Sequence, residues 1–290
     1  MTEKEYLTDE ILKAFQTVRR TRPLVHMIGS AVTSALCADA ISAVGGRPLM
    51  AQAEEEMEEI TSSADGLVVN LGQPSAEKYR ACEAALKTAA AHGIPTVMDP
   101  VGVGASGFRK NAAAGLASIP WSGIIKGNSS EIHTVLTGAM AHSGVDSIGS
   151  FSHEEESGEF LDRMQSGKRE IVMAETGSVD KILWKDRTCG KVRLIRLKHD
   201  SERPVILVGS GCVAGAVMGT LLAGKRKESQ VRLSSGEIAA AALAAVSMVS
   251  FCGESAGDCG YGTYKTTVLD ALSRPDVEKY RAYLSGNMEI

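Results

Sequence analysis

The feature that most constrains the fold of this chain is the repeated alternation of short apolar runs with longer helical segments. Continuous apolar stretches lie at residues 24–28, 66–71, 94–98, 123–125 and 171–174. Such runs are typical of parallel strands, because these are buried on both faces. Parallel strands also need a crossover connection, and the helical segments provide it. The alternation predicts an α/β fold with a mostly parallel central sheet flanked by helices.

The predicted helices fill the intervals between these runs. We expect the first over residues 8–20, where Thr8 or Asp9 can cap an amphipathic segment. The interval 75–92 has the length of an ordinary helix and is followed by a glycine. The last helix is expected over residues 265–284.

Two later segments differ from the parallel runs. Lys181–Lys185 and Lys191–Leu197 alternate apolar with polar residues, which predicts antiparallel strands that form a hairpin at one edge of the sheet. The chain has neither an internal repeat nor a linker rich in proline or serine. We therefore expect residues 1–290 to form a single domain.

The composition supports a large core and argues against charged polymeric partners. Of the 290 residues, 44% are hydrophobic and only 4% aromatic, which suits helices of small residues packed closely on a sheet. The net charge is −4, and no basic stripe with interleaved aromatic residues is present. A nucleic acid or an acidic membrane surface is therefore not an expected partner.

No segment predicts export or membrane insertion. The apolar run Ile238–Phe251 is shorter than a membrane span and is expected to be a core helix. The N-terminal residues Thr2–Tyr6 are polar and charged, unlike a signal peptide. The six cysteines show no Cys-x-x-Cys pair, which favours reduced thiols. These features predict a cytoplasmic protein.

The segment 204–217 carries the strongest chemical signal. An apolar run over 204–208, expected to be a strand, leads into Gly209, Ser210, Gly211 and Cys212 and then into a helix of small residues. A strand, a glycine turn and a helix start form an anion site, because the first helical N–H groups lack partners. The helix dipole also favours a thiolate at the cysteine. This suggests phosphoryl transfer to a small alcohol; the alternative is a tight turn with a buried structural cysteine.

Candidate site residues follow several predicted strands, at the edge where α/β sheets bind ligands. They are Gly29, Ser30, Met50, Asn70, Asp99, Lys126, Asn128, Glu131, Thr176 and the segment Gly209–Cys212. Single members of this set can instead cap helices, as in any α/β protein.

Asp99 precedes a glycine pattern that has two interpretations. Gly102, Gly104 and Gly107 match the dinucleotide fingerprint G-x-G-x-x-G. However, Asp99 and Pro100 stand between the strand and the glycines, where a carboxylate would repel a pyrophosphate. A direct or water-mediated contact to Mg²⁺ explains Asp99 better. A cap to the following turn is the structural alternative.

Two further candidates have both a functional and a structural interpretation. Lys126, Asn128 and Glu131 offer a cation, an amide and a carboxylate in one turn. Asn128 and Glu131 also have the spacing of a capping box, and both interpretations can hold at once. His26 lies near the end of the first strand, where it can contact a ligand or serve as a hydrogen-bonded structural histidine.

Taken together, these residues resemble the hydroxyethylthiazole kinase family of the ribokinase-like superfamily. The resemblance extends from about His26 to Leu222, and its motifs occur in the order expected for that family. The motifs are Asp99–Ala105 with Phe108 and Arg109, Lys126–Asn128 with Glu131 and Ile132, Gly144–Ser147, Thr176 and Gly177 with Val179 and Asp180, and Gly209–Cys212. Such an ordered series is more specific than one glycine loop. It implies a three-layer ribokinase-like fold.

The resemblance also implies an activity and an assembly. The activity is ATP-dependent phosphorylation of the hydroxyethyl group of 4-methyl-5-(2-hydroxyethyl)thiazole in thiamine salvage. The assembly is a homotrimer with active sites at the subunit interfaces. By position, the residues implied on the thiazole side are His26, Ser30, Met50 and Gly209.

The remaining implied roles concern ATP, Mg²⁺ and the transferred phosphoryl group. Lys126, Asn128 and Thr176 would bind ATP, while Asp99 and Glu131 would serve Mg²⁺ and its waters. The catalytic set would be Gly209, Ser210, Gly211 and Cys212. Their amides would hold the phosphoryl group, and Cys212 occupies the place of the aspartate base of the wider superfamily.

The chain departs from the family on the expected substrate wall. Relatives carry Thr-Asn where this chain has Gly29 and Ser30, and threonine where it has Val208. A missing amide would change which alcohol fits, because polar sites discriminate sharply. Two alternatives therefore stay open: a kinase for another small hydroxymethyl heterocycle, and a catalytically weak protein that binds a thiazole or a nucleotide.

Overall fold

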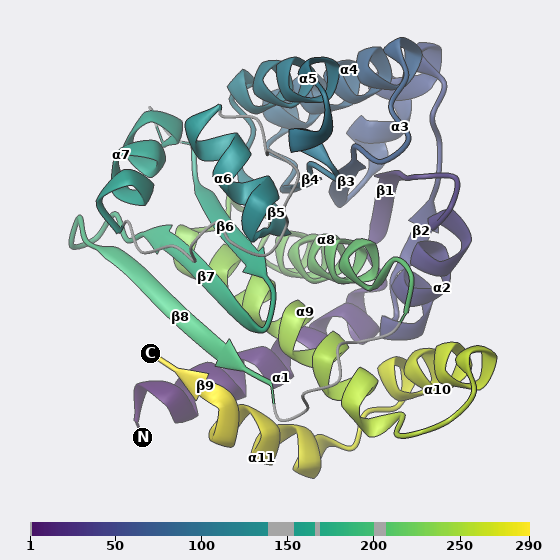
Figure 1. Ribbon diagram of the computed structural model, residues 1–290, viewed down its shortest axis with the longest axis vertical. Coiled ribbons are helices and arrows are strands. Elements are labelled where there is room, and N and C mark those ends of the chain that lie inside the picture. The colour runs from purple at the N-terminus through teal and green to yellow at the C-terminus, as the bar shows by residue number, and fades with distance from the viewer. Residues whose placement is uncertain (1, 139–153, 166–168, 200–206) are drawn as a thin grey trace.

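The computed structural model describes residues 2–138, 154–165, 169–199 and 207–290. In these residues a central sheet lies between two layers of helices (Figure 1). The motif Gly144–Ser147 and the greater part of the predicted strand 204–208 lie outside the described residues. Leu207 and Val208 are described and are not in a strand.

The described residues contain one nine-stranded sheet in the order β2-β1-β3-β4-β5-β6-β7-β8-β9. The strands are β1 Leu24–Ile28, β2 Arg47–Leu49, β3 Gly66–Asn70, β4 Thr96–Asp99, β5 Gly123–Asn128, β6 Ile171–Thr176, β7 Val179–Lys185, β8 Val192–Lys198 and β9 Met288–Glu289. Pairing is parallel from β2 to β6 and antiparallel from β6 to β9. The predicted mostly parallel sheet is therefore confirmed.

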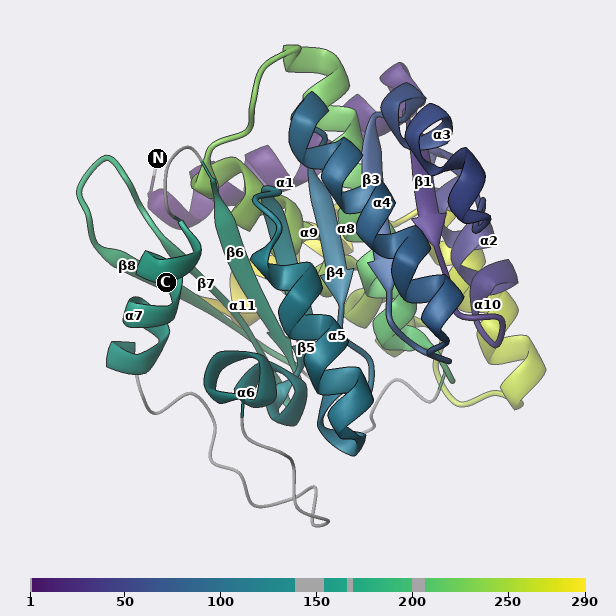
Figure 2. The same cartoon turned by 90° about the horizontal axis from the view of Figure 1, so that it is seen from above.

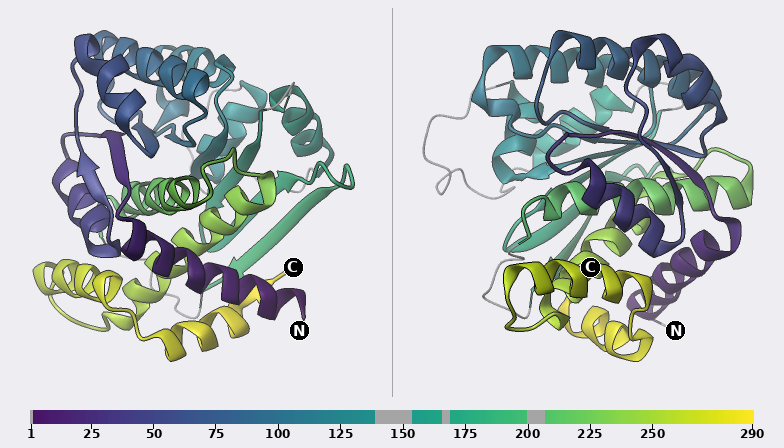
Figure 3. Two further views of the ribbon diagram at one scale, coloured as in Figure 1. Left: turned by 180° about the vertical axis from the view of Figure 1, so that it is seen from behind. Right: turned by 90° about the vertical axis from the view of Figure 1, so that its right-hand side faces the viewer.

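The helices divide into two layers, one on each face of the sheet (Figure 3, right). One layer holds α3 Met57–Ser63, α4 Ala76–His92, α5 Gly107–Ser118, α6 Ser129–Thr137 and α7 Glu154–Met164, with the short 3-10 helices η1 Glu54–Glu56 and η2 Val103–Ala105. The other holds α1 Glu3–Thr21, α2 Ser34–Val44, α8 Ser210–Ser229, α9 Ser235–Ser255, α10 Tyr261–Ser273 and α11 Val277–Asn287.

Each strand of the parallel part buries side chains on both faces. Val68 belongs to the core under α8 and α9, whereas its neighbours Leu67 and Val69 belong to the core under α4 and α5. Small residues let α8 approach the sheet closely, because a Cβ added at Gly219 would lie 2.2 Å from a methyl group of Val68. The continuous apolar runs in the sequence are the result of this two-sided burial.

Two predicted helices have different bounds in the structure. The first helix begins at Glu3, because Thr2 and Glu5 form a capping box. Thr8 lies inside the helix and does not cap it. The predicted helix 265–284 is two helices, α10 and α11. Pro275 separates them, since proline disfavours a helical conformation at the residue before it.

Two further predictions concern the periphery of the sheet and helix α9. The predicted hairpin is present as β7 and β8, but it does not form the edge, because β9 pairs with β8. Helix α9 is long and apolar enough to cross a membrane by length and composition, and 78% of its most apolar window is buried inside the protein. It is a core helix, as predicted for Ile238–Phe251.

Candidate active site

The candidate site lies at the edge of the sheet where the parallel strands end. The arrows of β1 and β4 point to this edge, here called the carboxyl edge (Figure 2). The last residues of β3 and β4, Asn70 and Asp99, are partners in the strand register. Lys126 lies near the end of the next strand, β5. Three polar side chains that are far apart in the sequence therefore meet at one place.

These three side chains form a buried hydrogen-bonded group. Asn70 donates from Nδ2 to Oδ2 of Asp99 at 3.0 Å, and Nζ of Lys126 lies 3.4 Å from Oδ1 of the same carboxylate. Burial raises the pKa of Asp99 to about 6, although the Lys126 ammonium opposes the shift. Burial tends to lower the pKa of Lys126, but the carboxylates of Asp99 and Glu131 outweigh it and raise that pKa.

The N-terminus of helix α8 lies against this group. The helix follows Gly209, whose φ of +91° is in the left-handed region, and no side chain caps it. Within the described part of the chain, the N–H groups of Gly211 and Cys212 have no hydrogen-bond acceptor. A Cβ added at Gly211 would lie 2.8 Å from Nζ of Lys126. Free amide groups and an ammonium group therefore lie together, which is the arrangement expected of an anion site.

Cys212 contacts the same polar group but is not predisposed to ionise. Its Sγ accepts a hydrogen bond from Nδ2 of Asn70 at 3.2 Å. Burial, followed by the negative charge of Asp99, raises the pKa of the thiol above its ordinary value. The expectation that the helix dipole would favour a thiolate here is wrong, because the dipole acts against desolvation and a nearby carboxylate.

Asn128 and Glu131 form the capping box that their spacing predicts. The Asn128 side chain accepts from the Glu131 N–H at 2.9 Å, and Oε2 of Glu131 accepts from the Asn128 N–H at 2.8 Å. The other oxygen, Oε1, accepts from the N–H of Gly102 at 2.7 Å. Glu131 thus ties the glycine segment after β4 to the start of α6. The Glu131 carboxylate therefore already accepts the N–H of Gly102, the first glycine of the pattern, and that N–H is not available to a pyrophosphate. The geometry gives no support to dinucleotide binding there.

The residues expected on the substrate side are divided between the surface and the core. Met50 lies beside Gly29, where an added Cβ would be 3.4 Å from the terminal methyl group of Met50. Ser30 is buried, and its hydroxyl donates to the side chain of Gln73 at 3.1 Å. Ser30 lies just after β1 and Met50 just after β2, so both are near the carboxyl edge.

His26 has a structural role, since both of its ring nitrogens are hydrogen-bonded within the protein. It is fully buried, and its ring nitrogens lie 3.0 Å from Oγ1 of Thr61 and 3.1 Å from the carbonyl oxygen of Ala51. Burial lowers the pKa of the imidazole, so the ring is neutral. Since both nitrogens are already bonded, the structure does not bring His26 into the polar group, and a contact to a ligand has no support in this geometry.

Thr176 ends β6, next to β5. Its hydroxyl donates to the carbonyl oxygen of Gly127 at 3.3 Å, and its register partner is Asn128. It therefore lies at the carboxyl edge, across β5 from Asp99.

Sequence reasoning missed Lys78, a buried cation at the same edge. Helix α4 presents its ammonium to the carbonyl oxygens of Gly29, at 2.8 Å, and Gly72, at 2.6 Å. Lys78 is only 9% exposed. A usable signal was its position four residues before Cys82, which places it on the buried face of the helix.

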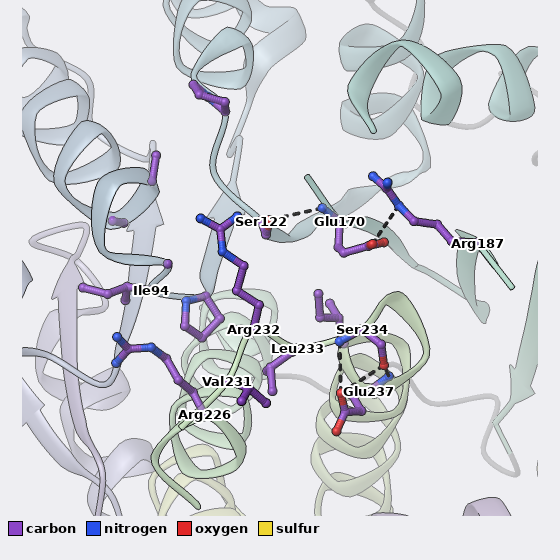
Figure 4. Close-up of a pocket in the computed structure, with 16 residues that line it drawn as sticks. Ile94, Ser122, Glu170, Arg187, Arg226, Val231, Arg232, Leu233, Ser234 and Glu237 are labelled. Carbon is purple, nitrogen blue, oxygen red and sulfur yellow. Dashed lines mark hydrogen bonds and ion pairs between the residues drawn. The ribbon is translucent and has the colours of Figure 1, made fainter. Parts of the chain in front are cut away.

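The opposite edge of the sheet carries a separate cavity of about 340 Å³. Glu170 and Arg187 form an ion pair on its wall, at 2.7 Å, while Ser234 and Glu237 are hydrogen-bonded to each other at the start of α9 (Figure 4). Pro95 precedes β4 and Pro120 precedes β5, so the cavity belongs to the amino edge. It contains none of the candidate site residues.

Comparison with known proteins agrees with this placement. Residues 15–278 match the model of the hydroxyethylthiazole kinase family. The chain is 32% identical to a hydroxyethylthiazole kinase from Rubrobacter xylanophilus, over 96% of this chain and 98% of that protein. It is 31% identical to one from Clostridium botulinum, over 92% of each chain.

Solved structures give the same result. A hydroxyethylthiazole kinase protein from Pyrococcus horikoshii superposes with a TM-score of 0.71 at 28% identity, over 93% of this chain and 95% of that chain. A ribokinase-like superfamily protein from Enterococcus faecalis superposes with a TM-score of 0.58 at 11% identity and shares the fold. The predicted ribokinase-like fold is thereby confirmed. With a family match over most of its length, the chain belongs to the hydroxyethylthiazole kinase family.

Proposed function

We propose that this protein transfers the γ-phosphoryl group of ATP to the hydroxyl group of 4-methyl-5-(2-hydroxyethyl)thiazole, as a kinase of thiamine salvage. The observation that carries the proposal is the open N-terminus of α8, with Lys126 beside it and Asp99 behind. Phosphoryl transfer depends mainly on positioning and on neutralising charge. The N–H groups of Gly211 and Cys212, which have no acceptor among the described residues, and the Lys126 ammonium supply both.

The two carboxylates fit a magnesium ion in different ways. Asp99 keeps oxygen lone pairs available, whereas both oxygens of Glu131 already accept backbone N–H groups. Across the described ranges, no cluster of three or more His, Cys, Asp or Glu side chains is gathered. This suits Mg²⁺, which typically takes one or two carboxylates and completes its shell with phosphates and water. When bound, the ion would offset phosphate charge; Asp99 would hold it, and Glu131 would act through water.

The other residues take roles that follow from their places. Gly209 and Ser210 shape the α8 turn that would hold the phosphoryl group, and Asn128 and Thr176 lie on the ATP side, at the ends of β5 and β6. Met50 and Ser30 line the alcohol side. Burial and the charge of Asp99 raise the pKa of the Cys212 thiol, so little thiolate is present at pH 7 to accept the alcohol proton, and its contribution to the rate is modest.

We further propose a single domain over residues 1–290, a homotrimeric assembly and a cytoplasmic location. The nine-stranded sheet of the described residues supports one domain. Val208 and Tyr261 expose apolar side chains at the α8 start, where the Tyr261 hydroxyl accepts the Val208 N–H at 3.2 Å, and this supports burial against another copy. Light scattering on the purified chain tests the assembly.

The activity is tested by ADP release in a coupled assay with a panel of alcohols. Saturable release that depends on hydroxyethylthiazole supports the proposal. Faster turnover of a hydroxymethyl pyrimidine or of a pyridoxal-type alcohol would favour another small heterocycle, which the departure at Gly29 and Ser30 makes the main competitor. Thermal stabilisation by the thiazole without ADP release would instead indicate a binding protein.

A further inference from the structure

Lys78 is a buried ammonium that the proposed mechanism does not use. Its Nζ donates to the carbonyl oxygens of Gly29, at 2.8 Å, and Gly72, at 2.6 Å. In the described residues no carboxylate forms an ion pair with it. Burial lowers the pKa of Lys78, an effect that the thiols of Cys82 and Cys212 oppose and that Arg109 reinforces. A cation held only by carbonyl groups is costly to bury, so its retention needs a reason.

The two carbonyl groups belong to different loops. Gly29 follows β1 and begins the segment that leads to α2, whereas Gly72 follows β3 and leads to α4. Nothing else among the side-chain hydrogen bonds of the described residues joins both carbonyls to one group. Gln73 also links the two loops, because its Oε1 accepts hydrogen bonds from the Ser30 hydroxyl at 3.1 Å and the Val32 N–H at 3.2 Å. The Lys78 ammonium adds a second, buried link, which joins the two main chains.

Ser30, which is proposed to bind the alcohol, lies in the first loop, and Met50, which follows β2, lies beside Gly29. A Cβ added at Gly29 would lie 3.4 Å from Met50, and one added at Gly72 would lie 3.3 Å from Cβ of Ser30. Asn70 contacts both Asp99 and Cys212. It also restrains the second loop, because its Oδ1 accepts the N–H of Gly72 at 3.0 Å. A shift of either loop would therefore displace the alcohol wall relative to the phosphoryl site.

We propose that Lys78 is a positioning residue for the alcohol substrate, holding the Gly29 and Gly72 loops in the arrangement that forms the alcohol-binding wall. The inference rests on the proposed kinase activity. It predicts that loss of the ammonium weakens alcohol binding and leaves ATP binding intact, because Lys126 and the α8 N-terminus do not depend on this bridge.

Arg169 provides a matched control at the other edge of the sheet. It is also buried, and its guanidinium donates to the carbonyl oxygens of Trp121, at 2.8 Å, and Ala117, at 2.9 Å. Burial lowers the pKa of Arg169 to about 10. The two residues share burial and carbonyl partners, so a difference between their variants isolates the effect of location.

The first experiment is steady-state kinetics on Lys78→Met, Lys78→Arg and Arg169→Met, with Lys78→Gln as the replacement if Lys78→Met does not fold. We expect Lys78→Met to raise the KM for the alcohol about tenfold or more and to change the KM for ATP by less than about twofold. Lys78→Arg should restore the alcohol KM to within about threefold, because a guanidinium also binds carbonyl groups. Arg169→Met should lower the Tm without this split.

A second readout does not need turnover. Hydrogen–deuterium exchange on the same variants reports the two loops directly, and Lys78→Met should speed exchange in residues 29–34 and 70–75 while Arg169→Met should not. Unchanged exchange in both segments would overturn the inference, as would an equal rise in both KM values. If the wild-type chain releases no ADP in response to the alcohol, the proposed function is wrong. The exchange measurement still decides in that case whether Lys78 holds the two loops.

Discussion

Helices α8 and α9 begin at opposite edges of the same sheet, and their first turns are built differently. At the amino edge, Ser234 caps α9, and Glu237 returns the bond to the Ser234 N–H in a complete capping box. At the carboxyl edge, α8 follows Gly209 and has no side-chain cap. In α9 the Ser234 side chain accepts the N–H of Glu237, the third residue of the helix, whereas among the described residues the corresponding N–H of Cys212 in α8 has no acceptor.

The contrast separates a helix N-terminus that is capped by its own side chains from one that is proposed to bind an anion. The dipole is similar in both helices, so it does not decide between them. What differs is the surroundings: Lys126 lies beside the α8 turn, whereas the acidic Glu237 lies in the α9 turn. The α8 turn can therefore accept phosphate, and the α9 turn stabilises the fold.

The largest expected effect comes from the carboxylate behind the α8 turn. Asp99→Asn keeps the shape of the side chain and removes the charge that would hold a metal ion, so kcat/KM should fall about a thousandfold in the coupled assay. Glu170→Gln, at the amino edge, serves as the control and should change kcat/KM by less than about threefold. A loss below about tenfold in Asp99→Asn would contradict the magnesium role.

A pair of glycine substitutions tests the two helix starts directly. Gly211 and Gly236 are each the second residue of their helices. Gly211→Ala would place a methyl group 2.8 Å from Nζ of Lys126, so the ammonium must move, and we expect the KM for ATP to rise about tenfold. Gly236→Ala meets nothing within 4 Å and should raise the free energy of unfolding by about 0.5 kcal/mol, with activity unchanged. Equal effects on the ATP KM would remove the functional contrast between the helices.

Cys212→Ser sharpens the role of the α8 turn. We expect ATP binding to be kept and kcat to fall about fivefold, because only the small thiolate fraction of Cys212 can accept the alcohol proton. Nucleotide titration and single-turnover measurements separate the two quantities. Turnover equal to that of the wild type would exclude a base role.

The smallest effect concerns the closed α9 turn. Burial raises the pKa of Glu237, but hydrogen bonds from the Ser234 N–H and hydroxyl lower it by more, so the net shift is downward. Its charge therefore stabilises the fold above the ordinary glutamate pKa, and this contribution is lost as the pH falls through the lowered value. Because the side chain is 37% exposed, Glu237→Gln should lower the free energy of unfolding by only about 0.5 kcal/mol at pH 7. Denaturant unfolding should show the difference vanish as the pH falls below the lowered pKa of Glu237.

The sequence predicted those parts of the site that depend on local patterns. The capping box of Asn128 and Glu131 follows from spacing alone and is confirmed. The helix that the sequence predicts after the glycine turn is also present, but it begins at Ser210, inside the segment Gly209–Cys212. The neutral state of Cys212 could not be predicted, because it depends on burial and on Asp99, more than one hundred residues earlier in the chain.

Lys78 and His26 show the same limit from two sides. Lys78 stands three residues after the Ser75 cap, where a lysine is ordinarily solvated, yet its ammonium is buried under two loops. His26 stands near a strand end, where a ligand contact is plausible, yet Thr61 and Ala51 occupy its ring nitrogens. In both cases a deciding partner comes from a distant segment: Gly29 for Lys78, and Thr61 for His26.

The sequence by itself determined the class of fold, the order of most strands and helices, and the family. It could do so because two-sided burial, capping and glycine turns leave short-range patterns in the chain. Only the tertiary structure decided which polar groups meet: Asp99 with Asn70 and Lys126, and Lys78 with the carbonyls of two loops. Burial, charge state and hydrogen-bond partners are properties of neighbours in space, and a linear pattern does not contain them.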